Sequence, residues 1–228
     1  MVIRIIVEGG AFPNQADNTY SATDMTLDGS EVLREELKKF FTAILGIADI
    51  SIIVSYQAGY KNAAKVFVAK PEENYLYTDL DDIPERRMDW FSHLEEEGIA
   101  IPDDRKPDVF FWIQEMEAWF LKQPQCIERW ATDRSIKIKK PIASDPLIYG
   151  KDIEHLQHKP SFVMKVIFQR DLENTRKGKN GKIQKLEYGK LRHAPRIIPY
   201  LMPQDLIVKD AELQAFVNRV KEQRLASI

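Results

Sequence analysis

The 228-residue sequence contains a single cysteine, Cys126, and therefore lacks both an internal disulfide framework and the multi-cysteine zinc motifs. Its hydrophobic content of 44% is enough for a sizeable core, so we expect the chain to fold without covalent cross-links. Cys126 stands in an apolar helical stretch and is predicted to be a small core residue. Such sparing use of cysteine is typical of a reducing cytoplasm.

Several common signatures are also missing from the sequence. It has no G-x-x-x-x-G-K-S/T loop, no G-x-S-x-G elbow and no G-x-G-x-x-G motif. An ATPase, a serine hydrolase and a dinucleotide-binding oxidoreductase are therefore unsupported. No stretch approaches the roughly eighteen uninterrupted apolar residues of a membrane span, and the chain begins with a strand-like run rather than a signal peptide. We expect a soluble, cytoplasmic protein without membrane association.

The formal charge of -2 conceals an uneven distribution of charge along the chain. Residues 1–128 contain 12 Lys and Arg against 24 Asp and Glu, whereas residues 129–228 contain 21 against 11. The first part is predicted to be an acidic core and the second a basic part packed on it. This asymmetry suits a nucleic acid that lies on the basic part while chemistry occurs at the acidic part. Two solvated faces that attract one another would explain the asymmetry equally well.

Apolar runs alternate with helical patterns in residues 1–128. Strands are predicted at 2–7, 50–54, 75–78 and 108–113, and helices at 30–45, 62–68 and 84–97, with Ser30 as the N-cap of the first helix. The alternation predicts an α/β fold with a mainly parallel, doubly wound sheet and helices on both faces. After Trp130 no run is strand-like for long, and helices are predicted at 151–170, 190–201 and 210–224. The C-terminal part is therefore expected to be mostly helical.

Acidic residues stand where three of the predicted strands end, and they fall into three groups: Glu8; Asp79, Asp81 and Asp82; Glu115 and Glu117. In an open α/β sheet, ligands bind outside the carboxyl ends of the strands, so acids at strand ends converge on one crevice. Mg²⁺ binds such oxygen ligands. Two carboxylates as close as Asp79 and Asp81 repel one another unless a cation lies between them, although a simple turn is the alternative. The pattern predicts a site for Mg²⁺ or Mn²⁺.

Local geometry narrows the set of predicted ligands to Glu8, Asp79, Asp81 and Glu117. In an extended segment Asp79 and Asp81 point to the same side, whereas the side chain of Asp82 points away. Glu117 stands beside Ala118 and Trp119, so it is favoured over Glu115 to point inward. Glu8 is followed by two glycines, which leave backbone room for a phosphate or a metal ion.

Residues that could bind phosphate stand late in the chain. A lysine-rich loop at 175–185 is followed by Tyr188-Gly189-Lys190, and lysines near a phosphodiester stabilise its charge. Most of the loop is expected to be dispensable, whereas Lys190 leads into an apolar helix and is a candidate catalytic residue. The pair His155 and His158 lacks accompanying zinc ligands, so a solvated helix face is favoured there.

These residues resemble a known arrangement, the Toprim domain, which has a glutamate after its first strand and an Asp-x-Asp after a later one. Here the corresponding residues are Glu8 and Asp79-Leu80-Asp81. The chain is more specifically similar to a poorly characterised bacterial family of Toprim-like proteins, related to overcoming-lysogenization-defect nucleases. The likeness is carried by the E-G-G at 8–10, by Q-E-M-E-A-W-F-L at 114–121, and by Tyr188-Gly189-Lys190 running into I-I-P-Y-L at 197–201. It covers nearly the whole chain, with one departure: 19 residues, 11–29, separate the E-G-G from the first predicted helix.

The resemblance implies a Toprim-like core, Mg²⁺ or Mn²⁺, and phosphodiester cleavage of the nuclease type. Asp79, Asp81 and Glu117 would hold one or two ions, Glu8 would be a further ligand or a general base, and Lys190 would neutralise phosphate charge. It also implies an effector in bacterial antiphage defence that works with an ATPase partner and acts on nucleic acid, with DNA favoured over RNA. Two alternatives stay open: a non-catalytic module that binds a partner ATPase or nucleic acid, and phosphoryl or nucleotidyl transfer without strand cleavage.

Overall fold

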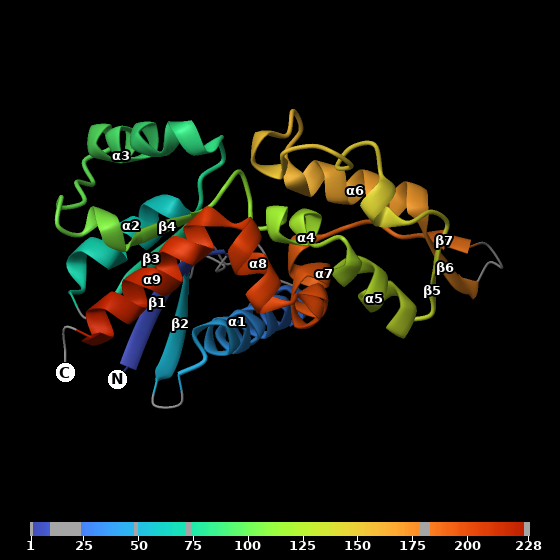
Figure 1. Ribbon diagram of the computed structural model, residues 1–228, viewed down its shortest axis with the longest axis horizontal. Coiled ribbons are helices and arrows are strands. Elements are labelled where there is room, and N and C mark those ends of the chain that lie inside the picture. The colour runs from blue at the N-terminus through green and yellow to red at the C-terminus, as the bar shows by residue number, and fades with distance from the viewer. Residues whose placement is uncertain (1, 10–23, 48–49, 72–73, 178–182, 226–228) are drawn as a thin grey trace.

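The computed structural model describes residues 2–9, 24–47, 50–71, 74–177 and 183–225. A four-stranded parallel sheet in the order β2-β1-β3-β4 is formed by β1 (Val2–Glu8), β2 (Ser51–Gln57), β3 (Tyr75–Asp79) and β4 (Val109–Trp112). An antiparallel sheet is formed by β5 (Ile136–Ile138), β6 (Leu172–Lys177) and β7 (Ile183–Lys185). The two sheets lie at opposite ends of the molecule (Figure 1). The predicted α/β class with a parallel sheet is confirmed.

Helices connect the strands of the parallel sheet and continue after it. Helix α1 (Asp24–Leu45) leads from β1 to β2, α2 (Tyr60–Ala69) from β2 to β3, and α3 (Arg87–Glu96) from β3 to β4. The later helices are α4 (Ala118–Lys122), α5 (Gln125–Asp133), α6 (Pro160–Asp171), α7 (Lys190–Ile197), α8 (Pro203–Lys209) and α9 (Ala211–Leu225). Short 3-10 segments span Pro84–Arg86, Lys106–Asp108, Ile142–Ser144, Ile153–His155 and Ile198–Tyr200. Among the described helices, none has the length and apolar character needed to cross a membrane.

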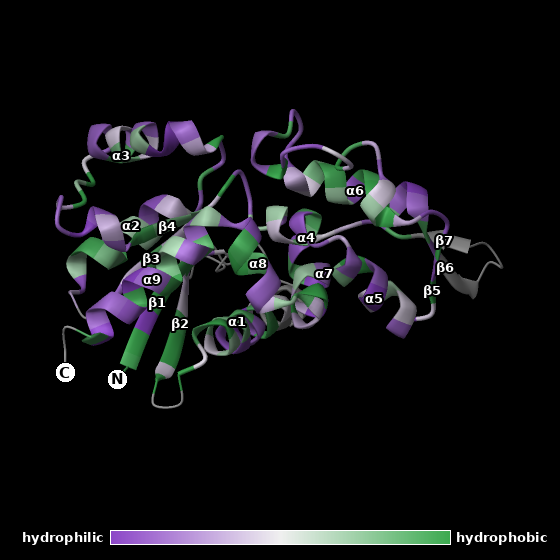
Figure 2. Cartoon of the chain, in the orientation of Figure 1, coloured by the Kyte–Doolittle hydropathy of each residue, from purple (hydrophilic) through white to green (hydrophobic). Residues whose placement is uncertain are grey.

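The parallel sheet is covered on both faces, as the sequence predicted. Alternate side chains such as Ile6 and Leu76 pack with α2 and α3 on one face. On the other face Val7 and Tyr77 belong to a larger core that includes residues of α1 and α9. The ring of Phe216 in α9 lies 5.3 Å from that of Tyr75 in β3. Figure 2 shows much of the central strand β1 in green, as expected of a strand buried on both faces.

The acidic and basic parts of the chain share one core. Helix α9 lies on the sheet of the acidic part, and α7 packs against α1. A Cβ on Gly29 of α1 would lie 2.9 Å from the carbonyl oxygen of Leu191 in α7, so the glycine permits this close approach. The change in charge at residue 128 falls inside α5. It therefore marks a boundary of charge rather than an end of a structural element.

Two predictions about secondary structure are wrong. The first helix begins at Asp24 rather than at Ser30, which lies inside the helix, and residues 10–23 lie outside the described part. The C-terminal part contains β5 to β7 in addition to helices, and a regular helix begins only at Pro160 in the segment 151–170. The strands β5 and β7 have three residues each, which is too short for an apolar alternation that would identify a strand.

Candidate functional site

The order of the strands indicates where the parallel sheet would bind a ligand. The chain goes from β1 to β2 on one side and then crosses back over β1 to β3 on the other side, so a topological switch point lies between β1 and β3. Open α/β sheets bind ligands at the carboxyl ends of strands at such a point. Glu8 is the last residue of β1 and Asp79 is the last residue of β3. Two predicted site residues therefore stand at the switch point.

Asp79 is held by two donors from different elements. Its Oδ1 accepts a hydrogen bond from the backbone N–H of Met116 at 2.9 Å, and its Oδ2 accepts one from Lys190 Nζ at 2.8 Å. Only 13% of its side chain is exposed. Burial raises the pKa of Asp79, and the charge of Lys190 opposes this shift. The 2.8 Å ion pair joins residues that are 111 positions apart in the sequence.

Glu117 is almost fully buried directly before α4, as its apolar neighbours predicted. Its side chain is 1% exposed, its Oε2 lies 3.7 Å from Lys190 Nζ, and its Oε1 accepts a hydrogen bond from the Tyr188 hydroxyl at 3.1 Å. No described group donates a hydrogen bond to Oε2. Burial raises the pKa of Glu117, again against the charge of Lys190. A buried carboxylate oxygen without a donor is costly, so it is a candidate ligand atom.

Lys190 stands at the first turn of α7, and its ammonium group pairs with both Asp79 and Glu117. Burial by itself lowers the pKa of Lys190, but the charges of Asp79 and Glu117 outweigh burial and raise it. The backbone before the helix is held by a hydrogen bond from the N–H of Gly189 to Nδ1 of His193 at 3.0 Å. The His193 ring stacks on Tyr188 with 5.7 Å between centroids, so the residue that binds Glu117 and the residue that binds Asp79 are positioned together.

Glu8 lies beside this cluster and uses a different partner. Its Oε2 accepts a hydrogen bond from the Thr78 hydroxyl at 2.5 Å. Strand alternation places Glu8 on the face of Ile6, whereas Asp79 shares the opposite face with Tyr77. Burial raises the pKa of Glu8, and the charge of Asp79 raises it further, so the two carboxyl groups interact electrostatically.

The glycines that follow Glu8 were predicted to leave backbone room at the sheet edge. A Cβ on Gly9 would lie 2.9 Å from the ring of Tyr56, so a glycine is needed where the chain passes this side chain. Gly10 lies outside the described residues. The close approach therefore gives the E-G-G pattern a packing reason at Gly9.

Asp81 departs from the geometry that the sequence indicated. Strand β3 ends at Asp79, and Asp81 has φ 60°, so the segment is not extended through Asp81 and the two aspartates do not share a face by strand alternation. The side chain of Asp81 is 56% exposed, and its Oδ1 accepts a hydrogen bond from Lys159 Nζ at 2.5 Å. Leu80 is buried and Asp82 is exposed, as predicted.

Gln114 links the ends of β3 and β4 to the basic part of the chain. It has φ 58°, its carbonyl oxygen accepts from the N–H of Asp81 at 2.8 Å, and its own N–H donates to Asp82. Its Nε2 donates to the carbonyl oxygens of Glu154 and Leu156, both at 3.1 Å. Left-handed backbone at a residue other than glycine is costly and persists where the surroundings enforce it.

The sequence analysis missed Gln114, Lys159 and Tyr188 as members of the site. Gln114 is the first residue of the Q-E-M-E-A-W-F-L stretch, and Tyr188 stands two residues before Lys190. Both belong to motifs that carry the family resemblance, but the motifs indicate no role for either residue. Lys159 precedes Pro160 at a helix start and carries no signal of its own. Glu115, which was set aside, accepts a hydrogen bond from the N–H of Ser161 at 2.8 Å and so caps α6.

The two imidazole candidates do not join the cluster. The backbone of residues 178–182 and the side chains of the lysine-rich loop lie outside the described part of the chain. His155 stands in a 3-10 segment, where it pairs with Asp152 at 2.7 Å and with Glu85 at 3.1 Å. His158 instead contacts the ring of Phe162. The two imidazoles therefore do not share one regular helix face.

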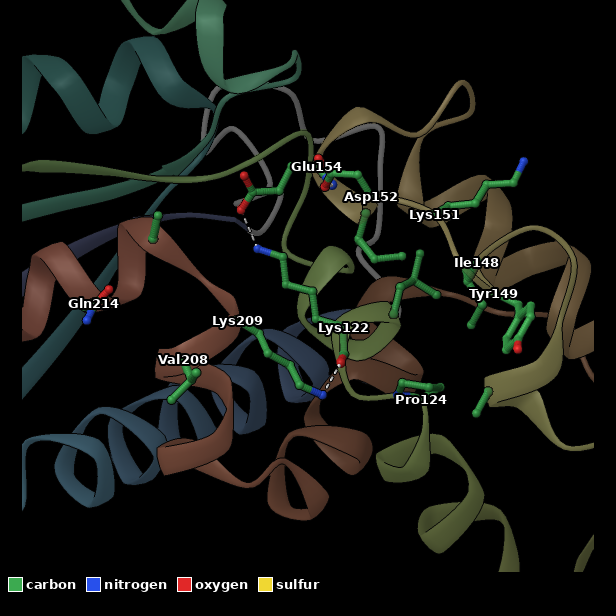
Figure 3. A pocket seen from close by; sticks show the side chains of 15 residues that line it. Lys122, Pro124, Ile148, Tyr149, Lys151, Asp152, Glu154, Val208, Lys209 and Gln214 are labelled. Carbon is green, nitrogen blue, oxygen red and sulfur yellow. Dashed lines mark hydrogen bonds and ion pairs between the residues drawn. The ribbon is translucent and has the colours of Figure 1, made fainter.

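A groove of about 540 Å³ lies between the end of α4, the segment 148–154 and the start of α9 (Figure 3). At its wall Lys122 Nζ donates to Glu154 at 2.6 Å and to Asp210 at 2.7 Å. None of the predicted site residues lines this groove. The two acids that line the groove are already paired, Glu154 with Lys122 and Asp152 with His155.

The acidic cluster matches a divalent cation in chemistry but not in its present arrangement. Carboxylate oxygens are the ligands that Mg²⁺ and Mn²⁺ favour, and Glu117 Oε2 is a buried oxygen without a donor. Within the described residues, however, no three Asp, Glu, His or Cys side chains are grouped to hold a metal ion. The ammonium of Lys190 lies between Asp79 and Glu117 instead. A cation bound there would have to share these anions with Lys190.

Together the fold and the cluster define an α/β protein whose parallel sheet presents buried, lysine-paired acids at its carboxyl edge. Comparison of the chain with protein-family models, with curated proteins and with solved structures finds no match.

Proposed function

We propose that the chain is a divalent-metal-dependent nuclease of the Toprim-like class that cleaves phosphodiester bonds. The observation that carries the proposal is the buried Glu117, whose Oε2 has no donor, beside Asp79 and Lys190 at the switch point of a parallel sheet. Maintaining such a group costs stability, which favours a functional reason for it. The Toprim-like assignment belongs to the proposal and rests on the sequence motifs and on the parallel sheet that carries them.

In this proposal Asp79, Asp81 and Glu117 hold Mg²⁺ or Mn²⁺, and Glu8 is a further ligand or the general base for the attacking water. Divalent cations held by these oxygens supply charge stabilisation for both the attacking and the leaving oxygen of a phosphodiester. Burial raises the pKa of Glu8, which brings the carboxylate nearer to the range that suits proton transfer. Thr78 orients Glu8 through its hydroxyl.

Lys190 neutralises the charge of the phosphate. Its ammonium is anchored by Asp79, and 33% of its side chain is exposed. An ammonium group fixed in this way stabilises charge that develops on phosphate oxygens without having to reorganise.

The substrate is nucleic acid, with DNA favoured over RNA, and the basic part of the chain guides it to the site. Both lysines that contact the acidic cluster, Lys159 and Lys190, come from residues 129–228. Positive charge near the backbone of a nucleic acid supplies affinity by releasing counterions. The role as an antiphage effector with an ATPase partner remains part of this proposal and rests on the family resemblance alone.

The test compares the wild-type protein with Asp79→Asn and with Asp82→Asn. Supercoiled plasmid, single-stranded DNA and RNA are incubated with Mg²⁺ or Mn²⁺. Because metal ions supply several kcal/mol of charge stabilisation, Asp79→Asn should lower cleavage by about 100-fold or more. Asp82→Asn is the matched control, since this exposed neighbour is outside the cluster and should leave cleavage unchanged. Equal cleavage by Asp79→Asn and wild type would contradict the proposal.

A second candidate is a non-catalytic module that binds a partner ATPase or nucleic acid. It is favoured by the ion pairs that already neutralise the acids within the described structure, where no group of metal ligands is arranged. Binding that survives a chelator, together with no cleavage under any metal, would support this candidate. Incorporation of labelled nucleotide would instead support the third possibility, nucleotidyl transfer.

A further inference from the structure

Lys159 and Asp81 form an ion pair at the solvent side of the acidic cluster. The lysine directly precedes α6, and its Nζ lies 2.5 Å from Asp81 Oδ1. The two side chains are 55% and 56% exposed. An ion pair this open to water is weak and can exchange partners. In this respect it differs from Lys190, which two buried anions hold.

The backbone around Lys159 is nevertheless fixed relative to the cluster. On one side, Gln114 Nε2 donates to the carbonyl oxygen of Leu156 at 3.1 Å. On the other side, the N–H of Ser161 donates to Glu115 at 2.8 Å. Both anchors follow strand β4 directly, in the segment that also contains Glu117. The flexible lysine side chain is therefore presented to Asp81 from a backbone that the site itself holds in place.

We propose that Lys159 is a built-in competitor of the divalent cation at Asp81, and that the ammonium released on cation binding becomes a contact for the nucleic-acid phosphate. The inference rests on the proposed function. The ammonium and a divalent cation both seek the same carboxylate, and their positive charges repel one another at contact distance. A lysine head on a four-carbon stem can move without displacing the backbone. The same residue thus opposes cation loading before substrate arrives and adds affinity afterwards.

Calorimetric titration with Mn²⁺ alone tests the competition. Removal of the competing charge in Lys159→Gln should tighten Mn²⁺ binding about threefold, the change expected for loss of one exposed ion pair. Lys159→Arg retains the charge and should behave as wild type. Lys165→Gln is the matched control, because Lys165 is an exposed lysine of α6 that forms no ion pair among the described residues. It should leave the affinity unchanged.

Binding of a double-stranded DNA oligonucleotide in Mn²⁺ tests the second role. Lys159→Gln should weaken the affinity about threefold and reduce the slope of log affinity against log salt by about one, as expected for loss of one phosphate contact.

The outcomes separate the inference from the proposed function. If the wild-type protein does not bind Mn²⁺ at all, the metal site and the inference are both wrong. If it binds Mn²⁺ and Lys159→Gln binds it equally well or more weakly, the metal site stands and the competition is overturned. Tighter Mn²⁺ binding without weaker DNA binding would overturn the phosphate role.

Discussion

Asp79 and Asp81 are two residues apart, yet they meet their lysines in different surroundings. In the inner pair, Asp79–Lys190, the aspartate is 13% exposed and the ammonium also faces the buried Glu117. In the outer pair, Asp81–Lys159, both side chains are more than half exposed. Breaking a buried pair leaves an uncompensated charge, whereas an exposed pair contributes little. An aspartate–lysine pair therefore fixes the geometry of the site at the inner position, whereas at the outer position it can exchange partners.

The largest effect is expected when the inner pair is broken. Lys190→Met leaves Asp79 and Glu117 buried without a cation, which should lower the free energy of unfolding by about 3 kcal/mol at pH 8. Urea denaturation measures this change. The matched substitution in the outer pair, Lys159→Met, should cost less than about 1 kcal/mol. Equal losses for the two variants would remove the distinction between the pairs.

The pH dependence of Lys190→Met sharpens the same point. Burial already raises the pKa of Asp79 and of Glu117, and loss of the ammonium raises both further. The folded variant then binds protons more tightly than the unfolded chain, so its stability falls as pH rises through the raised pKa values. The deficit relative to wild type should therefore be smaller at pH 5 than at pH 8. A deficit that does not depend on pH would show that the two carboxyl groups are not the cause.

The inner pair also depends on a buried neutral histidine. Burial lowers the pKa of His193 from 6.5 to about 4, and its Nδ1 accepts the N–H of Gly189 just before Lys190. A depressed folded pKa gives stability that is present above pH 6.5 and is lost as pH falls toward 4, a loss of about 2 kcal/mol at pH 5. His193→Gln cannot titrate, so its unfolding free energy should fall less between pH 8 and pH 5. The exposed control His158→Gln should keep the full decline.

Much of the acidic cluster around the inner pair could be predicted from the sequence. Glu8 and Asp79 follow apolar runs, and parallel strands of one sheet end at a common edge, so their neighbourhood follows from the fold class. The burial of Glu117 followed from Ala118 and Trp119. The contact of Lys190 with Asp79 could not be derived, because it spans 111 residues and depends on how α7 packs on α1.

The geometry of the outer pair, Asp81–Lys159, could not be predicted from the sequence because it depends on backbone conformation. The expectation that Asp79 and Asp81 share one side required an extended chain, but Asp81 and Gln114 both have positive φ. No residue pattern announces left-handed backbone where the sequence offers no glycine. The partner of Asp81 is Lys159, 78 residues away, and it stands at a helix start that the periodicity placed inside a longer helix.

Gln114 supports the backbone around the outer pair, and its loss should have a moderate effect. Gln114→Ala removes two hydrogen bonds to carbonyl oxygens and should lower the free energy of unfolding by about 1–2 kcal/mol. Gln114→Gly removes the same bonds but adopts φ 58° without strain, so it should be no less stable than the alanine variant. The exposed control Gln125→Ala should be neutral. A glycine variant clearly less stable than the alanine variant would contradict the importance of the backbone conformation.

The smallest effect is expected for the outer pair itself, measured by a double-mutant cycle of Asp81→Asn and Lys159→Gln. The coupling free energy should be below about 1 kcal/mol and should fall further in 1 M salt, because exposed charges are screened. A parallel cycle of Asp79→Asn and Lys190→Gln should give a larger coupling that salt changes less, because this pair is far less exposed to solvent. If the outer coupling matched the inner one, Lys159 would be too firmly held to give way to a cation, and competition at Asp81 would lose its physical basis.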